Sequence, residues 1–296
     1  MRRRTLLASL AATPLAATAA RAAGTIKAVA TFTILADLVR QVGTNHVAVT
    51  SLVPPDGDAH VYQPRPADLR AIAQAQLLVE NGLGLEGWMQ RMGAAASFHG
   101  VRVVAAEKVT PRTMTEDGKV ATDPHAWQDP RNGVLYVQAI AAGLAAADPD
   151  HAEAYRDTGT RYAAEISKLD TWIAAQFAPI PPAQRRIITT HDAFGYYGAR
   201  YGIELLAAEG LSTEAEPSAK SIATLVAQIK REKVRAVFLE NMTDPRIAHM
   251  LASESGAVLG GTVYSDALSP PNGPAATYLA MLRHNTTLFV RAMTAT

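Results

Sequence analysis

Short runs of β-branched and apolar residues alternate with helical patterns along most of this chain, and this alternation restricts the fold more than any other feature. The candidate strands lie at 25–32, 46–53, 75–81, 101–107, 185–190, 202–208, 235–241 and 257–265. Segments with helical periodicity fall between them, at 34–42, 66–73, 87–92, 191–201, 218–231, 245–255 and 274–293. Such alternation is typical of βα units with mostly parallel sheets. We therefore predict an α/β fold with two similarly arranged halves.

One long amphipathic segment separates the two halves. Its apolar residues recur at steps of three, four and seven: Tyr155, Tyr162, Ile166, Leu169, Ile173 and Phe177. Pro149 suits the first turn of a helix, and Pro179 marks its end. About 29 residues at roughly 1.5 Å each would make a helix about 43 Å long. We expect a rod over 149–178 that joins a first lobe, 23–148, to a second lobe, 179–296. The alternative is one larger domain with a long helix packed on it.

The first 22 residues have the pattern of an export signal. Three arginines at 2–4 precede an apolar, alanine-rich run over 6–20, and Ala20-Arg21-Ala22 offers a cleavage site. The apolar run is shorter than a membrane span requires. The Arg-Arg-x-Leu-Leu pattern also admits the twin-arginine export route. We expect residues 1–22 to be a signal peptide and the mature protein to be periplasmic.

Composition narrows the chemistry that is open to the mature protein. The 296 residues include no cysteine, which excludes disulfides and thiolate metal ligands. A lipid anchor behind the signal peptide would also need a cysteine, so we expect a protein free in solution and not lipid-anchored. Removing residues 1–22 takes away four arginines and no acids, so 28 basic residues fall to 24 against 27 acidic ones, a net charge near −3. The sequence has no stripe of basic residues, so we do not expect a nucleic-acid partner.

Three of the eight histidines lie in loops that are rich in turn residues. His60 lies in "DGDAHVYQPRPADL", His125 in "DPHAWQDPRN", and His191 directly behind the strand pattern "IITT". Asp266, in "YSDALSPP", follows the last predicted strand. Ligands of open α/β sheets bind beyond the carboxyl ends of the strands. Each residue alone is more typical of a turn or a cap, but together they form a donor set suited to a divalent transition metal.

Neighbouring acids could support such a site. Asp58, Asp123 and Asp192 are adjacent in sequence to the three histidines and could accept hydrogen bonds from them or cap a helix. Glu240 ends another predicted strand, and we expect it to hydrogen-bond the backbone or the other lobe rather than to bind metal. The aromatic residues Trp127, Phe194, Tyr196 and Tyr197 are expected to pack around the site.

These motifs carry a resemblance that covers the chain from about 27 to 293. In their order, and with the long helix between the second and third, they resemble the metal-binding solute-binding proteins of ABC transporters, the zinc- and manganese-binding branch of the periplasmic binding proteins. The resemblance implies two Rossmann-like α/β lobes joined by one long helix, with the metal between the lobes. It places the four metal ligands at His60, His125, His191 and Asp266. It further implies delivery of the metal to a membrane permease with a cytoplasmic ATPase, and we expect a monomer.

The identity of the metal depends on details of the same motifs. Manganese-type members of this family often carry glutamate where this chain has His191, and three imidazoles favour zinc over manganese. Many zinc-uptake members carry a long His/Asp-rich loop before the second ligand, whereas the segment 107–123 is short and contains no histidine. We expect Zn²⁺ first, Mn²⁺ next and ferrous iron third. Because imidazoles bind metal only when neutral, we expect weaker binding below about pH 6.5.

A periplasmic metal-dependent hydrolase is the alternative function. It would use His191 and Asp192 as acid and base at a metal-activated water, with Glu240 as a possible general base. No G-x-S-x-G or H-E-x-x-H pattern supports it. A set of three histidines and one aspartate without an open position favours capture over catalysis, so we predict a binding protein that is not an enzyme.

Overall fold

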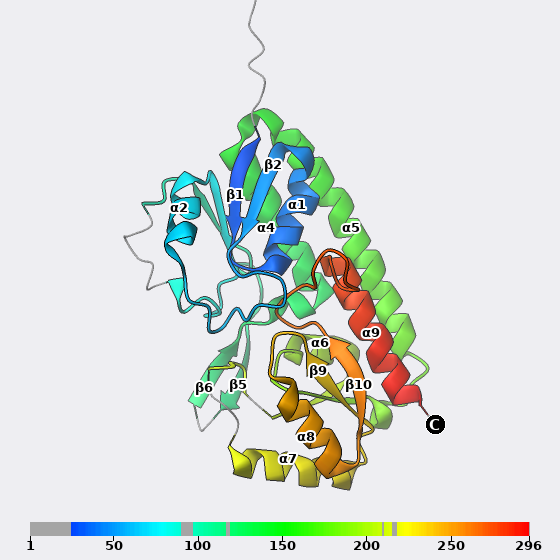
Figure 1. Cartoon of the computed structure of the whole chain (residues 1–296). Coiled ribbons are helices and arrows are strands. Elements are labelled where there is room, and N and C mark those ends of the chain that lie inside the picture. Colours follow the sequence, from blue (N-terminus) through cyan, green and yellow to red (C-terminus); the bar gives the residue numbers. More distant parts are fainter. Residues whose placement is uncertain (1–24, 90–96, 117–118, 209, 215–217, 296) are drawn as a thin grey trace, which may run out of the picture.

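The computed structural model describes residues 25–89, 97–116, 119–208, 210–214 and 218–295 (Figure 1). The predicted signal peptide, 1–22, lies outside these residues, as does the second half, 90–92, of the predicted helix 87–92. Among the described residues, no helix is both long and apolar enough to cross a membrane.

Two four-stranded parallel sheets form the centres of two lobes. The first has the order β2-β1-β3-β4, with β1 Ile26–Ala30, β2 Val47–Ser51, β3 Leu77–Glu80 and β4 Val101–Val104. The second has the order β10-β9-β7-β8, with β7 Arg186–Thr189, β8 Glu204–Ala207, β9 Ala236–Glu240 and β10 Val258–Val263. Every strand predicted from the sequence is present, and the predicted α/β class with mostly parallel sheets is confirmed.

Helices cover the sheets and connect the strands. They are α1 Thr33–Gly43, α2 Pro66–Gln74, α4 Pro130–Ala147, α5 Ala152–Phe177, α6 Gly195–Tyr201, α7 Ala219–Glu232, α8 Pro245–Ser255 and α9 Tyr278–Thr294. Short 3₁₀ turns lie at η1 Thr44–His46, η3 Ala126–Gln128, η4 Pro149–His151 and η5 Pro182–Gln184. Most apolar side chains between the layers form one core that includes Leu38 of α1 and Phe289 of α9. A second cluster, which includes Val237 and Leu251, lies in the second lobe.

The long helix α5 runs beside both lobes (Figure 1). All six apolar residues of the predicted stripe are buried. They face α1 and α4 on one side and α9 further along the helix. At the start of α5, the Asp148 carboxylate accepts hydrogen bonds from the Tyr155 hydroxyl at 2.6 Å and His151 Nδ1 at 2.7 Å. These contacts join the end of α4 to the beginning of α5.

Two elements were not predicted from the sequence. One is α4, whose alanine-rich sequence is apolar on most sides and so lacks an amphipathic pattern. The other is an antiparallel hairpin of β5 Arg112–Glu116 and β6 Lys119–Asp123. The sequence between its strands, Asp117-Gly118, is a strong hairpin signal that could have revealed it.

Candidate metal centre

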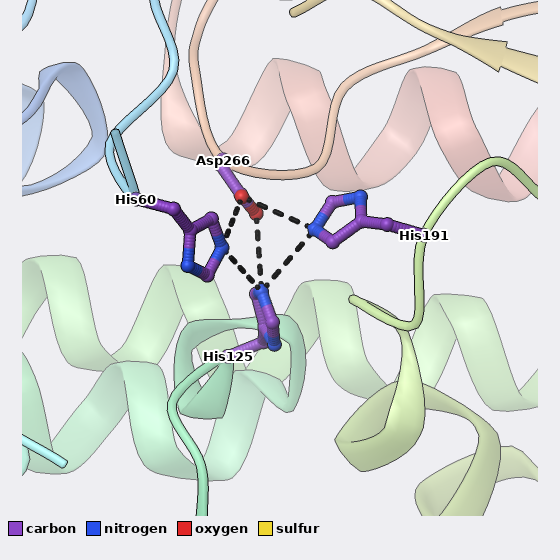
Figure 2. A group of neighbouring side chains, drawn as sticks. All are labelled: His60, His125, His191 and Asp266. Carbon is purple, nitrogen blue, oxygen red and sulfur yellow. Dashed lines mark hydrogen bonds and ion pairs between the residues drawn. The ribbon is translucent and has the colours of Figure 1, made fainter. Parts of the chain in front are cut away.

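Four side chains from different loops converge on one point (Figure 2). His60 lies in the loop between β2 and α2, His125 directly before η3, His191 two residues after β7, and Asp266 three residues after β10. The side chains of His125, His191 and Asp266 are fully buried, and His60 is 8% exposed. The structure therefore brings together all four residues singled out in the sequence.

The potential donor atoms lie within 4.8 Å of one another, and five of their six pairs lie 3.0 to 3.6 Å apart. His125 Nε2 lies 3.2 Å from His60 Nε2 and 3.3 Å from His191 Nε2. The Asp266 carboxylate lies 3.0 Å from His60 Nε2, 3.6 Å from His125 Nε2 and 3.3 Å from His191 Nε2. A tetrahedral metal about 2.0–2.1 Å from each donor sets neighbouring donors about 3.3–3.4 Å apart. The four side chains thus have the spacing of a tetrahedral ion's ligands.

Two carboxylates determine which ring nitrogens face the centre. His125 Nδ1 lies 2.8 Å from Asp123 Oδ1, and His191 Nδ1 lies 2.7 Å from Glu240 Oε2. Each Nδ1–H donates to its carboxylate, which leaves Nε2 as a lone pair directed at the centre. Lone pairs 3.3 Å apart repel each other unless a cation lies between them. The arrangement therefore requires a proton or a metal ion.

The Asp266 carboxylate faces the three histidines and has no other polar partner among the described residues. Across the described residues, neither of its oxygens receives a hydrogen bond from the backbone or from an amide or hydroxyl side chain. A buried carboxylate without donors is costly unless a cation compensates its charge. Its loop is held firmly, because the Ser265 carbonyl accepts from Trp127 Nε1 at 2.8 Å and Gln128 Nε2 at 2.7 Å. Asp266 is thus a fixed anion that faces three imidazoles.

The closeness of these carboxylates and imidazoles determines which of them are charged in the metal-free site. Burial alone would lower the pKa of His125, but the Asp266 and Asp123 carboxylates raise it to about 9. Burial likewise opposes the charge of His191, yet Glu240 and Asp266 hold its pKa well above the ordinary value. The pKa of Asp266 is well below its usual range, because the attraction of His125 and His191 overcomes the effect of burial. Without metal, the site holds protons in its place.

The acids near the histidines differ from one another in their roles. Asp123 accepts from both the His125 ring and its backbone N–H at 2.9 Å, as expected. Asp58 accepts from the backbone N–H of His60, at 2.8 Å, rather than from its ring. Glu240, rather than Asp192, orients His191. Asp192 does not begin a helix, since α6 starts at Gly195. Sequence separation hides the Glu240 contact, which arises because β9 is the neighbour of β7 in the sheet.

Two βα lobes that enclose a buried nitrogen-and-oxygen donor set define a class: binding proteins that trap a small cation between lobes. Sequence comparison gives the family within that class. The profile described as "zinc-uptake complex component A periplasmic" (ZnuA) matches residues 28–292, and the chain belongs to this family. The expected resemblance to metal-binding proteins of ABC transporters is confirmed.

Individual relatives agree with this assignment. The chain is 32% identical to the manganese-binding lipoprotein MntA of Halalkalibacterium halodurans over 90% of this chain and 88% of the relative. It is 31% identical to the iron-binding protein YfeA of Yersinia pestis over 86% of this chain and 82% of the relative. The solved structure of the periplasmic zinc-binding protein TroA from Treponema pallidum superposes with a TM-score of 0.87 at 27% identity, covering 92% and 100% of the two chains. The TroA structure shares the two-lobed α/β fold.

One expectation about location is wrong. We expected a mature protein without a lipid anchor, but several relatives, from Halalkalibacterium halodurans, Bacillus subtilis and streptococci, are named lipoproteins. The expectation depended only on the absence of cysteine. The absence of cysteine bears only on attachment through a cysteine-linked lipid. The names of the relatives bear on whether proteins of this family are held at a membrane. The extracellular or periplasmic side of a membrane fits these relatives.

Proposed function

We propose that this protein captures a divalent transition metal between its lobes and delivers it to the permease of an ABC transporter. In this proposal His60, His125, His191 and Asp266 are the ligands. One observation carries it: three Nε2 atoms and a carboxylate without other hydrogen-bond donors lie within 4.8 Å of one another, most of them 3.0 to 3.6 Å apart. The partners would be a membrane permease and its cytoplasmic ATPase, and the protein would act as a monomer.

The chain organisation fits the same proposal. Residues 1–22 would direct export, and lobes 23–148 and 179–296 would close on the metal, joined by the helix over 149–178. The ligands are divided between the lobes, with His60 on a loop of the first and His191 and Asp266 on loops of the second. Separating the lobes would remove donors from the ion, and this gives a route for release.

We infer capture rather than hydrolysis. A hydrolase would need a free general base beside the metal, and Glu240 was the candidate. Glu240 already interacts with protein groups: its Oε1 accepts from the Thr190 hydroxyl at 2.6 Å and the His191 backbone N–H at 2.8 Å, and its Oε2 lies 2.7 Å from His191 Nδ1. Asp266 and the three imidazoles fill the four positions of a tetrahedral ion and leave none for water.

Zinc is the proposed cargo, with manganese second. Three imidazoles and one carboxylate form a set that suits zinc, whereas manganese prefers more oxygen ligands. For a given site, zinc also binds more tightly than manganese. Since metal supply contributes to the cargo in the cell, the decisive measurement of cargo is the metal content of protein recovered from the compartment to which it is exported.

Calorimetric titration of metal-stripped protein tests the proposal. We expect one equivalent of Zn²⁺ to bind, more tightly than Mn²⁺, and the variants His60→Ala, His191→Ala and Asp266→Ala to lose or greatly weaken binding. His249→Ala, an exposed residue of α8, is the matched control and should bind like the unmodified protein. Full binding in all three site variants would refute the assignment of ligands, and no binding to the unmodified protein would refute the function.

A further inference from the structure

His60 is the member of the site that is held least directly. The rings of His125 and His191 rest on the carboxylates of Asp123 and Glu240. In the part of the chain that the structure describes, the His60 ring has His125 and Asp266 as polar partners, and it packs edge-on against the His191 ring. It is also the one exposed member, at 8% against 0% for the others. The position of His60 therefore depends on its loop.

That loop is a tight turn fixed at its base to the first lobe. Asp56 has a φ of +56°, and the Gly57 N–H donates to the Pro54 carbonyl at 3.1 Å. Trp88 Nε1 donates to the Ala59 carbonyl at 2.8 Å. The Asp58 carboxylate then accepts from the backbone N–H of His60 through Oδ1, at 2.8 Å. Asp58 thus fixes the position of the His60 backbone, which carries the imidazole.

Two side chains of the second lobe reach across to this turn. The Thr213 hydroxyl donates to Asp58 Oδ2 at 2.6 Å, so one carboxylate joins Thr213 to the backbone of His60. Asn241 Nδ2 donates to Asp56 Oδ1 at 2.8 Å. The same nitrogen lies 3.3 Å from the carbonyl of Ala267, the residue after Asp266. Both donors lie on loops that follow strands of the second sheet, β8 and β9.

We propose that Thr213 and Asn241 are positioning residues that hold His60 at the metal and thereby set the rate at which the metal leaves. This inference rests on the proposed function. Moving the His60 loop away from the second lobe must break both hydrogen bonds, and each has a carboxylate acceptor, which makes it stronger than a neutral pair. Loss of His60 from the shell removes one of four donors while the other three stay fixed. The two contacts form a clasp between the lobes.

The zinc dissociation rate, measured by mixing the loaded protein with an excess of a coloured chelator, tests the clasp. Thr213→Val keeps the shape and removes the donor, and we expect dissociation about ten-fold faster, the effect of one charge-assisted hydrogen bond. Thr213→Ser should restore the slow rate. The matched control is Thr224→Val on α7, whose hydroxyl donates within its own helix to the Lys220 carbonyl, and its rate should not change. Asn241→Ala should also accelerate release, which provides a second variant should Thr213→Val fold poorly.

A double-mutant cycle separates positioning from general loosening of the protein. If Thr213 acts on His60 through Asp58, Thr213→Val should weaken zinc affinity in the unmodified protein and have no further effect in Asp58→Ala. Equal weakening in both backgrounds would overturn the inference. So would unchanged dissociation in both Thr213→Val and Asn241→Ala, while leaving the proposed function intact. Failure of the unmodified protein to bind zinc would instead refute the proposed function itself.

Discussion

Glu240 shows how a residue outside the donor set determines what the site can bind. Its carboxylate accepts from Thr190 and from the backbone of His191, and its second oxygen faces His191 Nδ1 at 2.7 Å. Because this oxygen can only accept, the proton of His191 must lie on Nδ1 and the lone pair on Nε2. Burial would raise the pKa of Glu240, but the charge of His191 holds it below the ordinary value. Glu240 thus remains an acceptor.

Glu240→Gln should impair binding without changing the volume of the side chain. Glu240 faces three donors: the Thr190 hydroxyl, the His191 backbone N–H and His191 Nδ1. A glutamine has one oxygen and one NH₂ group, so its NH₂ would face one of these donors. Facing Nδ1, it would favour the His191 tautomer with the proton on Nε2. We expect zinc affinity to fall about 10- to 100-fold. The control is Glu204→Gln, a half-exposed carboxylate that pairs with Arg186 away from the site. Competition with a zinc-binding dye measures both, and unchanged affinity in Glu240→Gln would contradict this account of tautomer control.

The sequence could predict the four converging side chains but not all of their partners. Each of the four stands in a motif rich in turn residues, and three follow a strand, so a common sheet edge brings them together. Asp123 is two residues from His125 and was accessible to the same reasoning. Glu240 is 49 residues from His191, and its contact depends on strand order, which local sequence patterns do not encode.

At the scale of elements, the strands were predictable and α4 was not. Strands buried on both faces are recognisable from continuous apolar runs. Helix α4 is also buried widely, but its glycines, Gly133 and Gly143, weaken a helical prediction. The structure gives them a packing role. A Cβ at Gly143 would lie 2.2 Å from Val103 Cγ2 on β4, and one at Gly133 would lie 2.5 Å from the Tyr278 hydroxyl. These glycines allow close approach.

Gly143→Ala tests this explanation. Alanine raises intrinsic helix stability by about 1 kcal/mol, but the overpacking against Val103 should cost about 1–3 kcal/mol, and the side chain of a packed valine cannot move away freely. We expect a net loss of about 1 kcal/mol in the free energy of unfolding, measured with denaturant on metal-free protein. Gln138→Ala, an exposed position on the same helix, should stay within about 0.5 kcal/mol. A more stable Gly143→Ala protein would show that the glycine is not needed for close packing.

At the scale of the whole molecule, the site links the two lobes through charge. Three buried carboxylates, Asp123, Glu240 and Asp266, surround three imidazoles, and Arg112 Nε lies 3.5 Å from Asp123 as a fixed positive charge. A divalent ion together with Arg112 balances the three negative charges. Without the ion, protons on His125 and His191 supply the balance. The stability of the metal-free molecule therefore depends on pH through groups that lie between its lobes.

The direction of this dependence follows from the raised pKa of His125, about 9, and that of His191, which lies above its ordinary value. In the unfolded chain both titrate near about 6.5. Between that pH and about 9 the folded, metal-free protein binds more protons than the unfolded chain, so this part of its stability is complete below about pH 6.5 and is lost as pH rises towards 9.

Zinc must displace the same protons, so its affinity should continue to rise up to about pH 9, beyond the limit of about pH 6.5 expected for ordinary histidines. We therefore expect the increase in melting temperature caused by a fixed zinc concentration to grow from pH 6 to pH 9, because zinc binds more tightly as the imidazoles lose their protons. Calorimetric titrations in buffers of different ionisation enthalpy should show release of about two protons per zinc at pH 7.5, one from each raised imidazole. A zinc-induced shift in melting temperature that is the same at pH 6 and pH 9, with no proton release, would mean that the metal-free site holds no protons between its carboxylates.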